Sequence, residues 1–168
     1  MMMSSTNRIS QTLHEEHCAT IVLMERLEQL IARHRRGRPD IGDRAVAQLL
    51  SELAIGVTAE VQRHFDFEEH KLFAYLDAIG DNAIGAHLTE EHSVMRPLGV
   101  RLAQMARSAA VQGFDEPTWN EFCRVGGELC ERMLAHIQKE EMALLPLFDE
   151  NMDSDTDARL YQDYVENV

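Results

Sequence analysis

Histidines and glutamates recur in this sequence at spacings that suit metal binding. The pattern His-x-x-x-Glu-Glu occupies residues 64–69 and returns at 136–141, while Glu-Glu-His occupies residues 15–17 and returns at 90–92. Side chains four residues apart on an α-helix point nearly the same way, so each His-x-x-x-Glu pair offers a nitrogen and an oxygen ligand on one face. The repeat predicts two similar helical hairpins, each carrying two histidines and one glutamate.

The six histidines and glutamates of these patterns lie on the apolar faces of their predicted helices. Val61 and Leu72, for example, share the face that carries His64 and Glu68. Four imidazoles and two carboxylates are costly to bury without partners, and a metal centre would supply those partners. Four histidines and two bridging carboxylates around two divalent ions suit iron or manganese better than a tetrahedral structural zinc. The predicted metal ligands are His17, His64, Glu68, His92, His136 and Glu140.

Two other arrangements of buried histidines and carboxylates are alternatives to this one. Ferritin-like di-iron bundles use Glu-x-x-His pairs, but none of the eight histidines here has a glutamate three residues before it. The other alternative is a set of buried histidines hydrogen-bonded to carboxylates with no metal, which the repeat disfavours.

For several residues beside the predicted ligands, the sequence leaves a structural role and a functional role open. Four neighbouring glutamates are expected either to be solvated or to hydrogen-bond the ligand imidazoles; they are Glu16, Glu69, Glu91 and Glu141. His14 is either a boundary residue or part of an entry to the site, and Tyr75 is either a core residue or a donor to a bound ligand. Four leucines at equivalent offsets from the ligands are predicted to form an apolar layer beside the site; they are Leu13, Leu72, Leu88 and Leu144.

The elements that must position these residues are four long helices. Apolar residues recur at helical spacing between turns marked by glycine and proline, and nothing reads as a strand. The helices are predicted over residues 10–34, 43–79, 86–111 and 116–149. Because the connections are short, successive helices should be antiparallel neighbours, which gives an all-α, up-down four-helix bundle. The predicted organisation is a disordered N-terminus (1–9), the bundle (10–150) and an acidic C-terminal tail (151–168) with a possible short helix.

Composition limits the classes of partner. The chain has 168 residues, 45% of them hydrophobic, which suits one globular domain, and its net charge of −13 repels phosphate backbones and anionic lipid surfaces. Nucleic acid and membranes are therefore not expected as partners. The sequence has neither a membrane-spanning apolar run nor a signal-peptide pattern, so a cytoplasmic location is expected. Its three cysteines are widely spaced and predict no disulfide framework.

The motifs around His17 and at residues 64–69, 91–92 and 136–146 resemble the hemerythrin-like (HHE cation-binding) domain. The resemblance covers roughly residues 10–149, with four motifs in the same order. It implies an up-down bundle with a non-haem di-iron centre, in which two glutamates bridge the irons and four histidines complete the coordination. The resemblance assigns these roles to the six predicted ligands given above.

Two departures from the oxygen-carrying members of that family bear on function. Oxygen carriers place two histidines four residues apart on the third helix, whereas His87 here stands five residues before His92. They also use an aspartate on the fourth helix, where this sequence supplies Glu140. Both features resemble the branch with four histidines and two glutamates, in which iron-repair and iron-sensing proteins are found.

The resemblance therefore implies a di-iron protein that binds or reduces a small ligand. Dioxygen, peroxide and nitric oxide are the candidate ligands, in oxygen or nitric oxide response or in iron handling. One alternative is an iron or redox sensor that acts through a protein partner. Another is a bundle that holds zinc, manganese or another metal without turnover.

Overall fold

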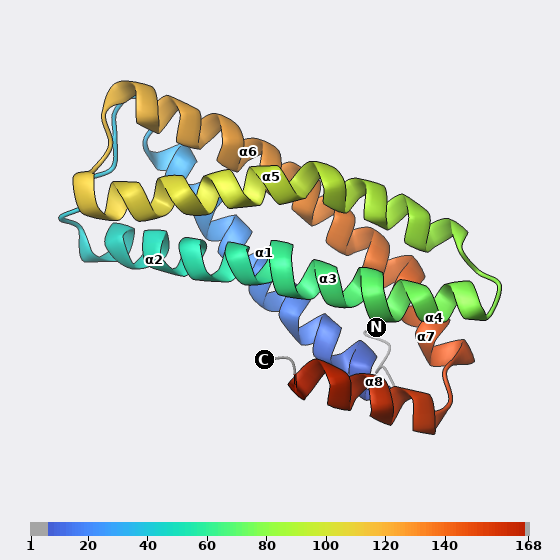
Figure 1. Ribbon diagram of the computed structural model, residues 1–168. Coiled ribbons are helices and arrows are strands. Elements are labelled where there is room, and N and C mark those ends of the chain that lie inside the picture. The colour runs from blue at the N-terminus through green and yellow to red at the C-terminus, as the bar shows by residue number, and fades with distance from the viewer. Residues whose placement is uncertain (1–6, 167–168) are drawn as a thin grey trace.

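Four long helices lie side by side, and a fifth, shorter helix crosses one end of the bundle (Figure 1). The computed structural model describes residues 7–166, and within that range it contains no strand. The elements are α1 (Arg8–Arg33), α2 (Arg44–Ala59), α3 (Phe65–Phe67), α4 (Phe73–Ala78), α5 (Ala83–Gln112), α6 (Glu116–Lys139), α7 (Leu145–Asn151) and α8 (Ser154–Glu166). The segments α2 to α4 form one continuous helix, as do α6 and α7. The predicted all-α bundle is confirmed.

The helix boundaries agree with the sequence prediction to within three residues. α1 begins at Arg8, and Asn7 before it is buried and donates from Nδ2 to the Phe148 carbonyl oxygen at 2.8 Å. The predicted disordered N-terminus falls mostly on residues 1–6, which lie outside the described residues. Within the predicted C-terminal tail, α8 forms a helix of 13 residues.

Side-chain caps explain where two of the long helices begin. Asp43 is the N-cap residue of α2, and its carboxylate accepts a hydrogen bond from the Ala45 backbone N–H at 2.9 Å. Asp115 and Thr118 form a capping box at the start of α6, where Pro117 occupies the first turn. These caps satisfy backbone N–H groups that a helix leaves without a partner.

Three π-helical turns interrupt the second and fourth long helices. They cover Glu60–His64 (η1), Glu68–Leu72 (η2) and Glu140–Leu144 (η3). The sequence predicted uninterrupted α-helices, so the structure differs here. π-turns are frequent at functional sites, where they change the direction of a side chain within a helix. Each of these turns begins or ends at one of the predicted ligands.

The core consists of two apolar clusters on either side of the predicted ligands. On every long helix the ligand residues separate members of one cluster from members of the other: Leu13 and Met24 flank His17 on α1, for instance. The four leucines of the predicted layer all have no exposed surface and belong to one cluster, which confirms that layer. The polar side chains are therefore held between two apolar regions that exclude water.

The helices α2 and α5 approach closely at Gly99. A Cβ atom added there would lie 2.5 Å from Val61 Cγ1 and 3.2 Å from Val57 Cγ1, and both valines are stiff β-branched residues.

None of the helices in residues 7–166 is both long and apolar enough to cross a membrane.

We expect Gly99→Ala to lower the free energy of unfolding of the metal-free protein by about 1–2 kcal/mol, because the overlap with Val61 outweighs the better helix propensity of alanine. Gly127→Ala is the matched control. A Cβ atom at Gly127 meets nothing within 4 Å, so this variant should gain up to about 1 kcal/mol. Urea unfolding measures both, and a Gly99→Ala variant as stable as the control would contradict the close approach.

Candidate metal centre

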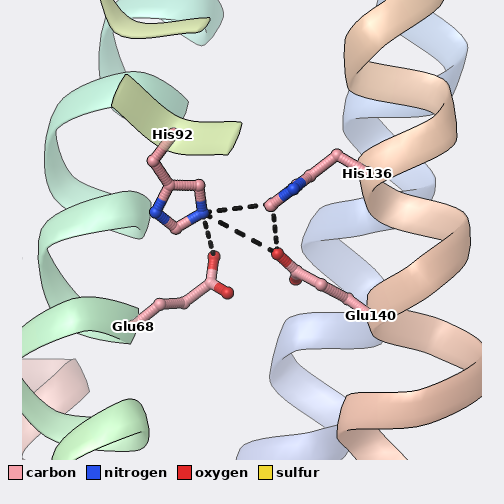
Figure 2. Close-up of side chains that lie close together, drawn as sticks. All are labelled: Glu68, His92, His136 and Glu140. Carbon is pink, nitrogen blue, oxygen red and sulfur yellow. Dashed lines mark hydrogen bonds and ion pairs between the residues drawn. The ribbon is translucent and has the colours of Figure 1, made fainter. Parts of the chain in front are cut away.

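The fold brings all six predicted ligands together in the middle of the bundle. One group contains Glu68, His92, His136 and Glu140, whose side chains point toward one another from two sides of the bundle (Figure 2). His92 Nε2 lies 3.1 Å from His136 Nε2 and 3.9 Å from one oxygen each of Glu68 and Glu140. Glu140 also contacts His136 Nε2. In each group the donor atoms lie within 4.8 Å of one another, so each group could hold a metal ion.

The second group contains His17, His64 and Glu140. His17 Nε2 lies 2.8 Å from Glu140 Oε2, and His64 Nε2 lies 2.6 Å from Glu68 Oε1. The Glu140 carboxylate therefore belongs to both groups, and Glu68 reaches a histidine of each. This is the arrangement that a pair of bridging carboxylates requires.

Several buried polar atoms at this site lack an aligned hydrogen-bond partner. They include both oxygens of Glu68, both oxygens of Glu140 and the Nε2 atoms of His17 and His64. Unpartnered polar atoms are rare in folded proteins because each one costs free energy. Imidazole nitrogens and carboxylate oxygens are ligands for divalent first-row metals. The donor set therefore fits metal ions, which would supply the missing partners.

A second set of four carboxylates, which we call the outer carboxylates, faces the Nδ1 atoms of the four histidines. Glu141 contacts His17 at 2.8 Å, Glu16 contacts His64 at 2.7 Å and Glu91 contacts His136 at 3.0 Å, each within hydrogen-bond distance. Glu69 lies farther from His92, at 3.5 Å, without an aligned hydrogen bond. Each outer carboxylate comes from a neighbouring helix, so these contacts link the four long helices in a closed ring. Such contacts fix the orientation of a metal-binding imidazole and raise its basicity.

The outer carboxylates have different second partners. Glu69 pairs with Arg96 and Glu91 pairs with Lys139, so two of them contact a fixed cation. Glu141 contacts His14 at 2.9 Å. The two central and four outer carboxylates thus face two fixed cations, Arg96 and Lys139. This excess of negative charge favours positively charged ligands.

The acidic groups also control protonation of the histidines. Burial lowers the pKa of His17, but the carboxylates of Glu140 and Glu141 outweigh burial and raise the pKa to about 10. The pKa of His136 rises to about 9, because Glu140, Glu68 and Glu91 outweigh burial. The pKa of His64 is also raised, by the charges of Glu60 and Glu68 against burial. In the metal-free protein these imidazoles therefore hold protons at neutral pH.

The two central glutamates have pKa values shifted in opposite directions. Burial beside the charge of Glu140 raises the pKa of Glu68. Burial also acts on Glu140, but hydrogen bonds from the surrounding histidines outweigh it and hold the pKa well below its usual range. Glu140 is consequently the carboxylate that stays charged most readily.

Sequence reasoning missed two residues that adjoin the site. Glu60 is buried, with Oε1 3.8 Å from His64 Nε2, and its other oxygen accepts from Thr20 Oγ1 at 3.3 Å. Its position four residues before His64 was the available signal. Phe65 stacks on the His92 ring at a centroid distance of 3.8 Å and an interplanar angle of 7°, and this contact between two helices leaves no signal in the sequence.

The structure also places the residues whose roles the sequence left open. His14 is partly exposed and contacts Glu141. His87 is exposed, 3.2 Å from Lys139 Nζ, and is not part of either group. Tyr75 is partly buried, with its ring 6.3 Å from Phe148, in the apolar cluster that contains the leucine layer.

Together the bundle and its buried histidines and carboxylates define a helical protein with a candidate site for metal cations. Residues 8–148 match the model of the hemerythrin HHE cation-binding domain. The chain therefore belongs to the hemerythrin HHE cation-binding family. A comparison with curated proteins found no match.

Proposed function

We propose that this protein is a non-haem di-iron protein that binds or reduces a small ligand. The observation that carries the proposal is the pair of buried donor groups that share Glu140. His17 and His64 would hold one ion, and His92 and His136 would hold the other. Glu68 and Glu140 would bridge the two ions.

The donor set supports iron over zinc. The two groups contain four imidazoles and two carboxylates and no thiolate. Structural zinc takes four ligands in a closed tetrahedron, whereas a larger nitrogen and oxygen set shared between two ions suits iron or manganese. Iron held there would supply redox chemistry and an electrophilic position for a small ligand.

The surroundings of the site support a ligand of a few atoms. The six donor residues are at most 3% exposed, so a bulky substrate has no direct route to them. A surface pocket of about 190 Å³ includes His64, Glu60 and Thr20 in its lining. Dioxygen, peroxide and nitric oxide are the ligands that match this size and the chemistry of iron.

The chain's own residues would perform three tasks around such a ligand. The four histidines hold the cations, and the outer carboxylates orient their imidazoles. The apolar clusters, which include Leu13 and Leu144 on one side, exclude bulk water. We propose a role in oxygen or nitric oxide response or in iron handling, with a small molecule rather than nucleic acid or a membrane as the partner.

Anaerobic loading with iron(II), followed by metal quantification, tests the proposal. We expect two iron ions per chain, and we expect the visible absorption spectrum to change on titration with oxygen, peroxide or nitric oxide. A protein that retains zinc but no iron, or that binds no metal, would overturn the proposal. A protein that loads two iron ions but responds to none of the three ligands would overturn the proposed ligand class.

A further inference from the structure

The C-terminal helix α8 is docked on the bundle beside the start of α1 (Figure 1). It buries three residues along one face, Asp157, Leu160 and Tyr164. Both oxygens of Asp157 accept hydrogen bonds, from the backbone N–H groups of Arg8 and Ile9, each at 3.0 Å. This helix lies beyond residues 8–148, the part of the chain that matches the family.

Two hydrogen bonds in series connect α8 to a predicted ligand. The Tyr164 hydroxyl donates to Glu16 Oε1. The other oxygen of Glu16 contacts His64 Nδ1 at 2.7 Å. On the opposite side of the same imidazole, Nε2 faces the Glu68 carboxylate. Tyr164 is therefore connected, through one intervening carboxylate, to the His64 nitrogen opposite the one that faces the proposed cation.

Tyr164 is firmly placed for this contact. Its side chain is buried, and its ring packs edge-on against Phe67 at a centroid distance of 4.8 Å. The Arg63 guanidinium lies 4.4 Å from the centre of the ring and donates to the Tyr164 carbonyl oxygen at 3.3 Å. None of these contacts uses the hydroxyl, so the hydrogen bond can be tested separately from the docking of α8.

The Tyr164 contact distinguishes one cation position from the other. The outer carboxylates of His92 and His136 are paired with Arg96 and Lys139, which belong to the long helices. The outer carboxylate of His64, Glu16, instead contacts a neutral phenol from α8. Tyr164 also lines the small surface pocket that includes His64. The His64 side of the site is thus the side that α8 covers.

We propose that α8 is a strap whose Tyr164 hydroxyl holds Glu16 against His64 and so controls how long the cation at the His17–His64 position is retained. Tyr164 is a positioning residue in this scheme. Without its hydroxyl, Glu16 can turn toward water, and the His64 imidazole loses the contact that fixes its orientation. Loss of an outer-shell partner typically costs about 10- to 100-fold in metal affinity. The inference rests on the proposed two-cation site.

The test uses the full chain loaded with two equivalents of cobalt(II), and follows the cobalt absorption during release to excess chelator. Tyr164→Phe should speed the release of one ion by about tenfold and leave the other unchanged. Glu16→Gln should speed the same phase, whereas Glu69→Gln should speed the other phase, because Glu69 contacts His92. The double variant Tyr164→Phe/Glu16→Gln should release that ion no faster than Glu16→Gln alone, since both changes break one chain of contacts.

Tyr161→Phe is the matched control, because Tyr161 lies on α8 and its ring faces Arg8 rather than the site. It should leave both release phases unchanged. Release from Tyr164→Phe at the rates of the unmodified protein would overturn the strap and leave the two-cation site standing. Multiplying effects of Tyr164→Phe and Glu16→Gln would also overturn it. A full chain that retains no cobalt would overturn both proposals.

Discussion

Glu140→Gln is expected to reduce the metal content from two ions per chain to one or none. The Glu140 carboxylate belongs to both donor groups and contacts histidines from three helices, His17, His92 and His136. Glutamine keeps the volume but removes the charge and replaces one ligand oxygen with an amide nitrogen that does not bind metal. Metal quantification after loading and desalting measures the change.

A control and a second variant keep the Glu140 result interpretable. Glu131→Gln removes one carboxylate from the exposed face of the same helix and should leave two ions bound. Removing one partner of a buried ion pair is strongly destabilising, so helical content must be checked by circular dichroism. Glu68→Gln tests the other shared carboxylate and should also lose at least one ion. If both variants fold and keep two ions, the bridging roles are wrong.

Metal binding is expected to release about two to three protons at pH 7, and the overall affinity should rise roughly 100-fold or more per pH unit up to about pH 9. Metal binding requires neutral imidazoles. In the metal-free protein the pKa of His17 is about 10 and that of His136 is about 9, and the pKa of His64 is raised as well. Cations must therefore displace protons at neutral pH, and this competition weakens as the pH rises.

The same pKa shifts give the stability of the metal-free protein a defined pH dependence. Because the pKa values of His17 and His136 are raised above 6.5, their stabilising contribution is complete below about pH 6.5 and disappears as the pH rises through about 9 to 10. Metal-loaded protein should lack this decline, because its imidazoles are already neutral.

Calorimetric titration with zinc in two buffers of different ionisation enthalpy measures the number of protons released. Thermal unfolding between pH 6 and 9.5, with and without metal, measures the stability difference. Metal affinity that does not change with pH would show that the histidines are neutral in the metal-free protein, contrary to the pKa shifts.

Local spacing was enough to predict the four long helices and the six residues at the centre of the bundle. His-x-x-x-Glu places its two side chains on one helical face wherever the helix is packed, so His64 and Glu68 meet in the structure as the spacing requires. Apolar residues around each motif showed which face is buried, and short connections made neighbouring helices antiparallel. These inferences depend on contacts within one helix or on helix length.

The contacts between helices could not be predicted in this way. The outer carboxylates lie one residue from a predicted ligand, but their histidine partners are on other helices, as with Glu16 and His64. The stacking of Phe65 on His92 is of the same kind. Which side chains meet across helices depends on the rotation of each helix about its axis, and that rotation is set by packing of the whole core.

The sequence by itself determined the family motifs, the helical bundle and the residues available to bind cations, because these follow from helical periodicity and from the cost of burying charge. Only the tertiary structure decided the π-helical turns at Glu60, Glu68 and Glu140 and the docking of α8 through Asp157 and Tyr164. A π-turn is a small local rearrangement that is favoured only when contacts with neighbouring helices stabilise the new side-chain direction. The position of an amphipathic C-terminal helix depends on the surface that the packed bundle presents to it.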